Sequence, residues 1–446
     1  MSIIKGSRPN GTAAPHSSKI KVIVVGTGLA GLATAVECHR KGHSVTLLER
    51  HSEVPTNGDG IGISPNAARI IRKWGNGVVN KHLQDFASDI KHVHTWSHTG
   101  KYINPTSFDD FTGVKGYLIH RASLIRVMYE HAKFLGIDIQ HDSSVTDYWE
   151  TGQEAGVVVN GEKVVADCVI CAEGIHSRGR SIITKSDFQE PQLDPIFSTF
   201  RGTLDTEALR QDPETRWAVE SESETTRDVY KVWTTHGMHL SIFTAQRGNI
   251  TVWYAAHKDK ALMTKSELEM ARQSPNIETA IGWIREWPLR EKLEPILRKA
   301  DNGRFIQAQI SSYQPLKTWR SPLGRMMVIG DAAHPTPPAS AQSGSQAIED
   351  GAVVAIALEL AGKNDVPLAL EVTEKIRYPR ATAVQEEGRS IQEDSFEKPE
   401  YEPEGRPEWM WDHDCQESTY REYELVAGAI RSGQNYIPTN CPALIV

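Results

Sequence analysis

The apolar positions near the start of the chain follow two different periods. Residues 20–25 form a short run rich in β-branched side chains, which is typical of a strand buried on both faces. Residues 29–41 then carry apolar positions at helical spacing, and a second apolar run follows at residues 44–48. A strand, a helix and a strand in this order predict the first βαβ unit of a parallel sheet.

The pattern changes in the middle of the chain. Two apolar runs flank Asn160-Gly161, a dipeptide typical of two-residue hairpins, and residues 167–172 predict a buried strand that returns to the first sheet. Between residues 196 and 257 the apolar period is close to two, which predicts antiparallel strands at residues 197–204, 228–235, 239–245 and 250–256. We expect this second sheet to cover a substrate pocket. Helices are expected over residues 265–300 and 344–360.

Composition narrows the class of protein. The chain has 446 residues, with 49 Lys and Arg against 57 Asp and Glu, a net charge of −8 and five cysteines. This acidic balance argues against a nucleic-acid partner, and an odd number of scattered cysteines argues against a disulfide framework. No apolar run is long enough to predict a membrane span, and residues 1–18 contain no apolar signal core, so we expect a disordered lead-in and a cytoplasmic enzyme.

A G-x-G-x-x-G motif follows the first strand, with its glycines at Gly26, Gly28 and Gly31. The first glycine permits a tight turn, the second lets backbone amides approach a pyrophosphate, and the third lets helix and strand pack closely. Glu49, at the end of the next strand, is placed to accept hydrogen bonds from a ribose, and Arg50 to contact a phosphate at the adenosine end. This fingerprint is shared by FAD and NAD.

A second motif distinguishes the two dinucleotides. An apolar strand near Met326 leads into Gly330-Asp331-Ala332-Ala333-His334-Pro335, and a long helix follows a Pro- and Ser-rich loop. An acid at a strand end can hold the hydroxyls of a linear polyol, and a helix N-terminus favours an anionic ring edge beyond it. A flavin offers a ribityl chain and such an edge, whereas NAD has no ribityl chain. The sequence therefore predicts FAD.

The ordered motifs resemble those of the FAD-dependent aromatic hydroxylases, the group A flavoprotein monooxygenases, and in particular the salicylate-hydroxylase-like monooxygenases of fungal metabolism. The resemblance covers roughly residues 21–389 and rests on four motifs. They are Gly60-Ile61-Gly62-Ile63-Ser64-Pro65-Asn66-Ala67, His120-Arg121-Ala122-Ser123-Leu124, Ala172-Glu173-Gly174-Ile175-His176-Ser177 and Gly330-Asp331-Ala332-Ala333-His334-Pro335, which we call the Gly-Asp box. It implies cofactor contacts from Gly62, Ile63, Arg121, Glu173, Asp331, Ser343 and Gly344. Two positions depart from the family pattern: Glu173 replaces the usual Asp, and Ala341-Gln342-Ser343-Gly344 replaces the usual Gly-Gln-Gly.

The resemblance also implies a fold and a reaction. The fold would be α/β, a Rossmann-like FAD-binding domain of the aromatic-hydroxylase type with an inserted antiparallel-sheet substrate domain. In such enzymes NADPH or NADH, bound only transiently, reduces the flavin, O2 adds at C4a, and the hydroperoxide transfers oxygen to an electron-rich carbon. The function implied is hydroxylation of an aromatic or other electron-rich secondary metabolite. The alternatives are epoxidation or oxidative rearrangement of an indole or polyketide, or a non-catalytic flavin-fold binding protein.

Three residues of the predicted second sheet are catalytic candidates. Arg201 lies in Thr199-Phe200-Arg201-Gly202, which resembles the family's substrate arginine, and a substrate carboxylate, enolate or phenolate would neutralise it. Tyr230 is placed to hydrogen-bond a phenolic oxygen, and His239 to shuttle a proton near neutral pH. We predict no metal site. We also discount Cys168 and Cys171 as a redox pair, because residues three apart on a strand face opposite sides.

These predictions divide the chain into segments. We expect a discontinuous FAD-binding domain from residues 19–90, 115–190 and 320–390, and a substrate domain from residues 91–114 and 191–319. Residues 391–446 form a C-terminal extension that begins with an acidic, exposed linker and then docks back on the protein. The chain would act as a monomer or homodimer on a small molecule.

Overall fold

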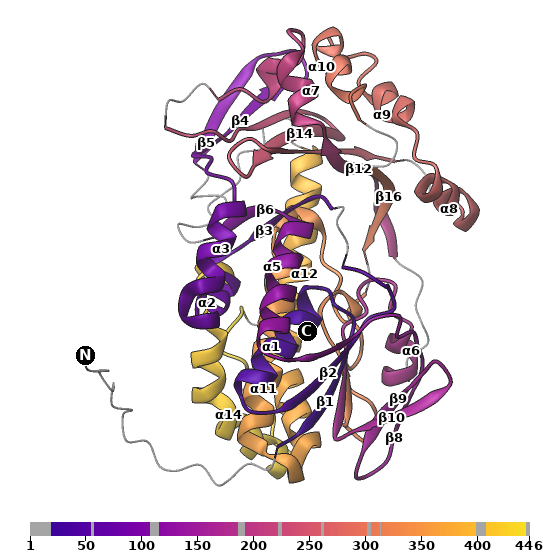
Figure 1. Cartoon of the computed structure of the whole chain (residues 1–446), viewed down its shortest axis with the longest axis vertical. Helices are drawn as coiled ribbons and strands as arrows, with labels where there is room; N and C mark the ends of the chain where they lie inside the picture. Colours follow the sequence, from indigo (N-terminus) through magenta and orange to yellow (C-terminus); the bar gives the residue numbers. More distant parts are fainter. Residues whose placement is uncertain are drawn as a thin grey trace.

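The computed structural model describes residues 19–54, 58–107, 116–185, 192–221, 225–259, 263–300, 305–312, 314–397 and 407–442. The lead-in predicted for residues 1–18 lies outside these ranges. The described chain has a mixed α/β fold with two bodies stacked along the long axis (Figure 1). The lower body holds a parallel sheet and most of the helices, and the upper body holds a larger, mostly antiparallel sheet that we call the roof sheet.

The parallel sheet has the arrangement that the first motif predicts. Its five strands lie in the order β17-β11-β1-β2-β7 and all their pairings are parallel. The strands are β1 (Lys21–Val25), β2 (Ser44–Leu48), β7 (Asp138–Gln140), β11 (Cys168–Cys171) and β17 (Met326–Val328). The strands predicted before and after the G-x-G-x-x-G motif, and the returning strand at residues 167–172, are thus confirmed.

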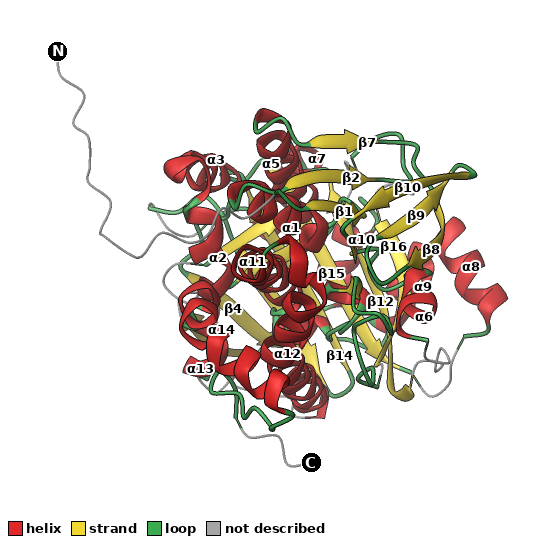
Figure 2. Cartoon of the chain, turned by 90° about the horizontal axis from the view of Figure 1, so that it is seen from below, coloured by secondary structure: helices red, strands yellow, loops and turns green. Residues whose placement is uncertain are grey.

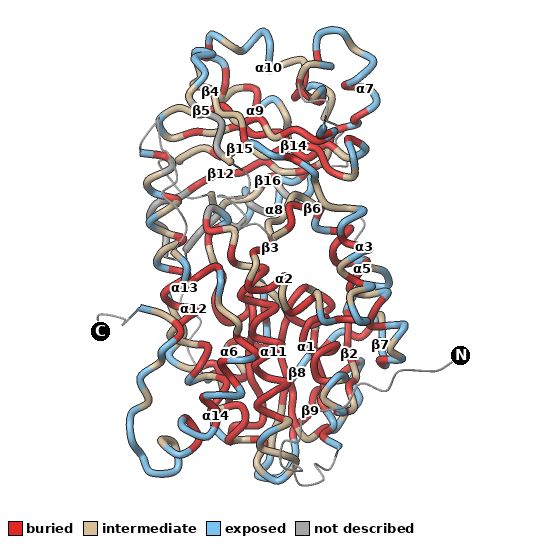
Figure 3. Tube along the Cα trace, turned by 90° about the vertical axis from the view of Figure 1, so that its left-hand side faces the viewer, coloured by how far each residue is buried: buried red, intermediate tan, exposed pale blue. Residues whose placement is uncertain are grey.

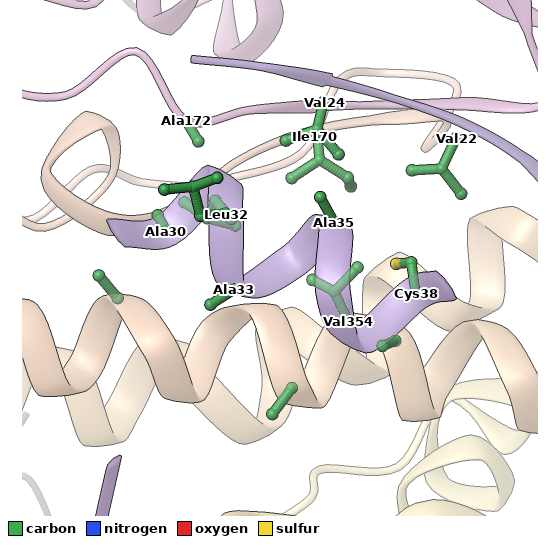
Figure 4. Packing of buried hydrophobic residues seen from close by; sticks show 14 of the residues in the cluster. Val22, Val24, Ala30, Leu32, Ala33, Ala35, Cys38, Ile170, Ala172 and Val354 are labelled. Atoms are coloured by element: carbon green, nitrogen blue, oxygen red, sulfur yellow. The ribbon is translucent and has the colours of Figure 1, made fainter. Parts of the chain in front are cut away.

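Helix α1 (Leu29–Arg40) lies between this sheet and α11 (Ser343–Ala361), and its two faces pack on both (Figure 4). Small residues allow the close approach: a Cβ on Gly351 would lie 2.6 Å from the backbone nitrogen of Thr34. Around α11 lie α12 (Val366–Glu397) and α14 (Cys415–Ser432), so that it runs through the centre of the helical layer (Figure 2). The predicted helices at residues 29–41 and 344–360 are confirmed.

Smaller elements complete the lower body. The hairpin β9 (Ala155–Val159) and β10 (Glu162–Ala166) turns through Asn160 and Gly161, whose φ values of 51° and 87° are those of a type I′ turn. The two-stranded sheet of β3 (Gly60–Ile63) and β6 (Tyr117–His120) lies between the two bodies. The remaining elements are α2 (Pro65–Arg72), α3 (Val78–Phe86), α5 (Arg121–Phe134), β8 (Val145–Glu150) and α6 (Gly179–Thr184).

The roof sheet has seven strands in the order β16-β12-β15-β14-β13-β4-β5. They are β4 (His92–Ser97), β5 (Tyr102–Ser107), β12 (Gln192–Leu204), β13 (Tyr230–Thr235), β14 (Met238–Ala245), β15 (Ile250–Lys258) and β16 (Phe305–Ser312). The four predicted strands are confirmed, whereas β4, β5 and β16 extend the sheet beyond them at its two ends, which the sequence pattern does not single out. Buried positions gather in the roof sheet and in the centre of the lower body (Figure 3).

The two faces of the roof sheet have different neighbours. The outer face carries Phe200, Leu240 and Trp253, which form one buried cluster with residues of α9 (Ile277–Trp283) and α10 (Arg290–Leu297). The inner face carries Phe243. A Cβ added on Gly60 would lie only 2.2 Å from the Phe243 ring, so strand β3 packs directly against this ring. Helices α7 (Thr206–Gln211) and α8 (Lys265–Gln273) lie at the margins of the roof. The inner face is therefore the one turned toward β3 and the lower body.

Helix α12 joins the two bodies. It runs along the long axis from the lower body to the roof sheet (Figure 1) and continues past Arg389 to Glu397. The exposed linker expected at the start of the extension is therefore wrong for residues 391–397, because these residues belong to α12, and glutamate favours a helix. After the undescribed residues 398–406, α13 (Glu408–Trp411) and α14 return to the lower body as expected. Within the described ranges, no helix is long and apolar enough to cross a membrane.

Candidate functional site

The three motif glycines have different surroundings. Gly26 has φ +104°, and a Cβ there would lie 2.6 Å from the carbonyl oxygen of Ala172 on the neighbouring strand connection. A Cβ on Gly31 would lie only 1.8 Å from the Gly26 oxygen, whereas a Cβ on Gly28 would meet nothing within 4 Å. Gly26 and Gly31 thus permit close packing, while Gly28, the N-cap of α1, leaves the space beside the helix N-terminus open. This arrangement fits a pyrophosphate.

Glu49 lies at the carboxyl end of β2 and supports the same loop. One carboxylate oxygen accepts hydrogen bonds from the backbone N–H and the hydroxyl of Thr27, at 2.9 and 2.6 Å, and the other accepts from the His51 N–H at 3.0 Å. Burial acts to raise the pKa of Glu49, but the donors of Thr27 and His51 hold it below its usual value. The ionised carboxylate keeps lone pairs for a ribose diol. Arg50 is exposed and donates to the His51 ring at 3.1 Å.

The Gly-Asp box meets the N-terminus of α11. The hydroxyl of Ser343, the first residue of α11, donates to the carboxylate of Asp331 at 2.6 Å. A Cβ on Gly344 would lie 2.9 Å from the side chain of Ile61 and 3.0 Å from that of Leu29. The starts of α1 and α11, strand β3 and Asp331 therefore converge, as a bound FAD requires. The added hydroxyl of Ser343 thus orients the Asp331 carboxylate, and a contact of this carboxylate with the ribityl chain stays a prediction.

The remaining predicted cofactor residues lie around this point. Ile63 is fully buried, and a Cβ on Gly62 would lie 3.4 Å from that of Ala341, so β3 lies against the loop before α11. Arg121 is exposed at the start of α5, and its backbone N–H donates to the Asp59 carbonyl at 2.8 Å. Contacts of Gly62, Ile63 and Arg121 with the isoalloxazine ring stay predictions, and Ile63 offers no exposed surface for one.

Glu173 makes contacts that the family pattern does not predict. Its carboxylate accepts from the Ser177 hydroxyl at 2.9 Å and from the Gly179 N–H at 2.8 Å, at the start of α6. The longer side chain thus stabilises the N-terminus of this short helix. Its carboxylate is engaged by the protein, and a contact with the flavin stays a prediction.

A buried ionic network lies behind the Gly-Asp box. His334 Nε2 is 2.6 Å from an Asp350 oxygen, and that oxygen also accepts from the Gly330 N–H at 2.9 Å. The other Asp350 oxygen accepts from Arg377 Nε at 2.8 Å, and Arg377 also pairs with Glu349. Burial acts to raise the pKa of Asp350, but His334 and Arg377 hold it below its usual value. These fully buried charges fix the backbone of the box.

Sequence reasoning missed this network, although it leaves a signal. Glu349 and Asp350 are adjacent acids in α11, and the residues around them in this helix are buried. Arg377 and Arg380 lie three residues apart on α12. Charged residues with such neighbours need partners in the interior. The pairing of His334 with Asp350 indicates that His334 stabilises the backbone of the Gly-Asp box.

The predicted substrate arginine has a partner in the protein. Arg201 on β12 lies opposite Tyr254 on β15, and its Nη1 is 3.0 Å from an Asp59 oxygen just before β3. The pair is partly covered, with 32% of the Arg201 side chain and 18% of the Asp59 side chain exposed. The buried Nε–H of Arg201 has no acceptor among the described residues. Arg201 therefore already has an acidic partner in the protein, and its contact with a substrate anion stays a prediction.

The other two candidates also lie on the inner face. Tyr230 lies opposite Phe243, and their ring centroids are 5.6 Å apart. Burial raises the pKa of Tyr230, although its hydrogen bond with Ser241 acts to lower it. His239 is 5.1 Å from the Tyr254 ring, and burial lowers the pKa of His239 to about 4. A neutral His239 argues against a proton shuttle near pH 7. The structure thus assembles an aromatic surface near Arg201.

The cysteines and possible metal ligands add no second site. Cys168 and Cys171 are buried free thiols on β11, and burial raises the pKa of each to about 12. In the ranges that the structure covers, no group of three or more His, Cys, Asp or Glu is placed to hold a metal ion.

Comparison with known proteins gives matches over most of the chain. Residues 19–305 match the family model described as an FAD binding domain. The FAD-dependent monooxygenase okaB of Penicillium ochrochloron is 40% identical, with 96% of this chain and 95% of the relative covered. The asperlicin C monooxygenase of Petromyces alliaceus is also 40% identical, over 97% of this chain and 95% of the relative.

Solved structures show the same relationship. The crystal structure of CtdE in complex with FAD and a substrate has a TM-score of 0.87 at 36% identity, covering 93% of this chain and 100% of that one. A salicylate hydroxylase complex, at 24% identity and a TM-score of 0.71, shares the fold. These matches favour an enzyme over a non-catalytic flavin-fold binding protein.

Proposed function

Since this chain belongs to the FAD-dependent monooxygenases of secondary metabolism, we propose that its substrate is a neutral indole, oxygenated at the C2=C3 bond. NADPH or NADH and O2 are the co-substrates, and the products are the oxygenated indole, NAD(P)+ and water. The bound FAD supplies the activation of O2 and the transfer of one oxygen atom. We expect a cytoplasmic monomer or homodimer.

The pairing of Arg201 with Asp59 carries this proposal. A phenol is a strong carbon nucleophile in its ionised form, and a phenolate or carboxylate in this pocket requires a cation with free charge. Arg201 already lies 3.0 Å from the Asp59 carboxylate, so the pair is close to neutral. An anion brought to Arg201 would also face Asp59, at a cost in repulsion. An indole needs no ionisation to react at C3, and therefore fits the pair better.

The inner face offers what a neutral aromatic substrate needs. Tyr230, Phe243, His239 and Tyr254 contribute rings at 5.1 to 5.6 Å from one another in two contacting pairs. Such rings bind a flat apolar molecule and exclude water from the site. The Arg201 side chain is 32% exposed, so the accessible part of its guanidinium can donate to an oxygen that gains negative charge on the substrate as the reaction proceeds. Asp59 holds the guanidinium in place for this role.

The cofactor residues have separate tasks. Gly28 and the N-terminus of α1 hold the pyrophosphate, Glu49 holds the ribose, and Asp331, oriented by Ser343, holds the ribityl hydroxyls. The asperlicin C monooxygenase, a relative at 40% identity, supports a defined metabolite as the substrate, since its name describes a monooxygenase acting on one such compound.

The test compares a neutral and an anionic aromatic. The FAD-loaded protein is mixed with NADPH or NADH and either 2,3-dimethylindole or salicylate, and nicotinamide oxidation is followed. We expect the indole to stimulate oxidation and to gain one oxygen atom, and salicylate to have little effect. Stimulation by salicylate and not by the indole would contradict the proposal.

Removing the carboxylate beside Arg201 sharpens the comparison. Asp59→Asn leaves the guanidinium charge without its partner, so we expect salicylate to bind more tightly to this variant. Asp212→Asn is the matched control, because Asp212 pairs with Lys299 at 2.7 Å away from the inner face. Equal salicylate affinity in the two variants would show that Asp59 does not control anion binding at Arg201, which would contradict the proposal.

A further inference from the structure

The last turn of α12 brings an aromatic side chain to the inner face of the roof sheet. Phe396 is 3% exposed and belongs to a buried cluster with Phe197 and Ala256 of the roof. Its ring centroid is 4.3 Å from that of Phe197 and 5.1 Å from that of His239. A residue close to the C-terminal end of the described helix is thus part of the surface that faces the lower body.

The strand register places Phe396 on the same face as Arg201. On β12, Phe197 and Arg201 are four residues apart, and side chains two or four apart on a strand share one face. Arg201 lies opposite Tyr254, and His239 contacts both the Tyr254 ring and the Phe396 ring. A continuous row of side chains therefore leads from Arg201 to Phe396.

The length of this row is set by the strand. Four residues at about 3.3 Å each separate the two positions on β12 by about 13 Å. A molecule with several fused rings that is held at Arg201 and lies along the row reaches the Phe396 ring. A one-ring or two-ring substrate does not.

Contacts at both ends of its last turns hold Phe396 and helix α12 in this position. The Gly237 N–H, in the turn between β13 and β14, donates to the Phe396 carbonyl at 2.8 Å. The neighbouring Glu397 pairs with Lys258 and lies 3.4 Å from His236 Nε2. Lower on the same helix, Gln385 donates to the Pro335 carbonyl in the loop after the Gly-Asp box at 3.0 Å. Helix α12 is therefore held both at the flavin loop and at the roof sheet.

We propose that Phe396 is a specificity-determining residue, which closes the substrate pocket at the end away from Arg201 and limits the size of the ring system. This inference rests on the proposed function, because it takes the inner face as the substrate surface. Its chemistry is steric exclusion: the ring occupies the space into which a larger ring system would extend, and a smaller side chain at this position makes room for it.

The test measures the affinity of two indoles for the FAD-loaded protein. The probes are 2,3-dimethylindole and an indoloquinolizidine, a four-ring indole, each titrated while the flavin absorption spectrum is recorded. We expect Phe396→Ala to change the ratio of the two Kd values by at least about fivefold in favour of the larger probe. Phe396→Trp should change it in the opposite direction. Neither variant should alter FAD content, because Phe396 lies on the roof side.

Phe305→Ala is the matched control. Phe305 is 4% exposed, as buried as Phe396, but its ring lies on the outer face against Phe200 and Trp253. We expect this variant to lose stability and to keep the wild-type Kd ratio. If Phe396→Ala does not fold, Phe396→Leu removes the ring with a smaller loss of volume and should shift the ratio in the same direction.

The outcomes separate the two hypotheses. If both indoles change the wild-type spectrum and the Phe396 variants keep the wild-type ratio, Phe396 does not determine specificity and the proposed function stands. If neither indole changes the wild-type spectrum, the proposed substrate class is wrong and the role of Phe396 falls with it.

Discussion

Arg380 joins the C-terminal extension to the network behind the Gly-Asp box. Its side chain is fully buried, and its Nε and Nη2 lie 2.9 and 3.1 Å from the two oxygens of Glu349. It also donates to three backbone carbonyls of the extension, those of Trp409, Asn440 and Met410, at 2.6, 2.9 and 3.0 Å. One guanidinium thus holds α11, α13 and the segment after α14 together.

We predict that Arg380→Met strongly destabilises the protein. Methionine keeps most of the volume, but Glu349 remains buried with Arg377 as its remaining cation. Removing one partner of a buried ion pair typically costs about 3–5 kcal/mol, and here Arg377 would be left to compensate both Glu349 and Asp350. The three carbonyls lose a donor as well, so we expect a loss of free energy of unfolding at the upper part of this range.

The assay is thermal and denaturant unfolding of the FAD-loaded protein, with hydrogen exchange of α13 and α14 as a local readout. The matched control is Arg298→Met at the C-cap of α10, where Arg298 pairs with Glu278 and Glu294 on the surface; we expect no measurable change there. Equal stability of the two variants would refute the reasoning. So would a destabilised Arg380→Met protein whose α13 and α14 keep wild-type protection.

Three further predictions concern other parts of the molecule. Gly28→Ala should keep the stability of the FAD-free protein, because its Cβ meets nothing within 4 Å, but should weaken FAD binding measured by flavin fluorescence; unchanged affinity would contradict the pyrophosphate site. His239 and His413, whose pKa values burial lowers to about 4, remain neutral in the folded protein while the unfolded chain takes up protons below pH 6.5. Stability should therefore be complete above pH 6.5 and fall toward pH 4, and a melting temperature that stays constant or rises over this interval would exclude the effect. Cys168 and Cys171, with pKa values raised by burial to about 12, should react with a thiol reagent at pH 8 only on unfolding; rapid labelling of the folded protein at either position would show otherwise.

Local patterns in the sequence predict most of the fold. The strands flanking the G-x-G-x-x-G motif, the Asn160-Gly161 hairpin and β12 to β15 are all governed by side-chain periodicity and turn residues, which act within a few residues. The acidic residues after Arg389 were predicted to form a linker, because composition alone does not distinguish an exposed helix from a linker. Glutamate is common in exposed helices and in linkers alike. The contacts of Phe396 with the roof sheet and the pairing of Glu397 with Lys258 stabilise the helical form.

The site is less accessible from sequence because its key contacts join distant segments. Arg201 was identified by its strand and its motif, but Asp59 follows a different strand and no local signal links the two. The same holds for Arg380 and Glu349, whose pairing depends on how α11 packs on α12. Residue types predicted the chemistry, and the tertiary fold decided which charges are already neutralised.

The central claim is that this monooxygenase transfers oxygen to a neutral indole. The most direct measurement incubates the FAD-loaded protein with 2,3-dimethylindole, NADPH or NADH and isotopically labelled O2, and determines the mass of the product. We predict a product that carries one labelled oxygen atom and forms only when the nicotinamide is present. Nicotinamide oxidation that yields only hydrogen peroxide with this indole, together with labelled product from salicylate, would contradict the account.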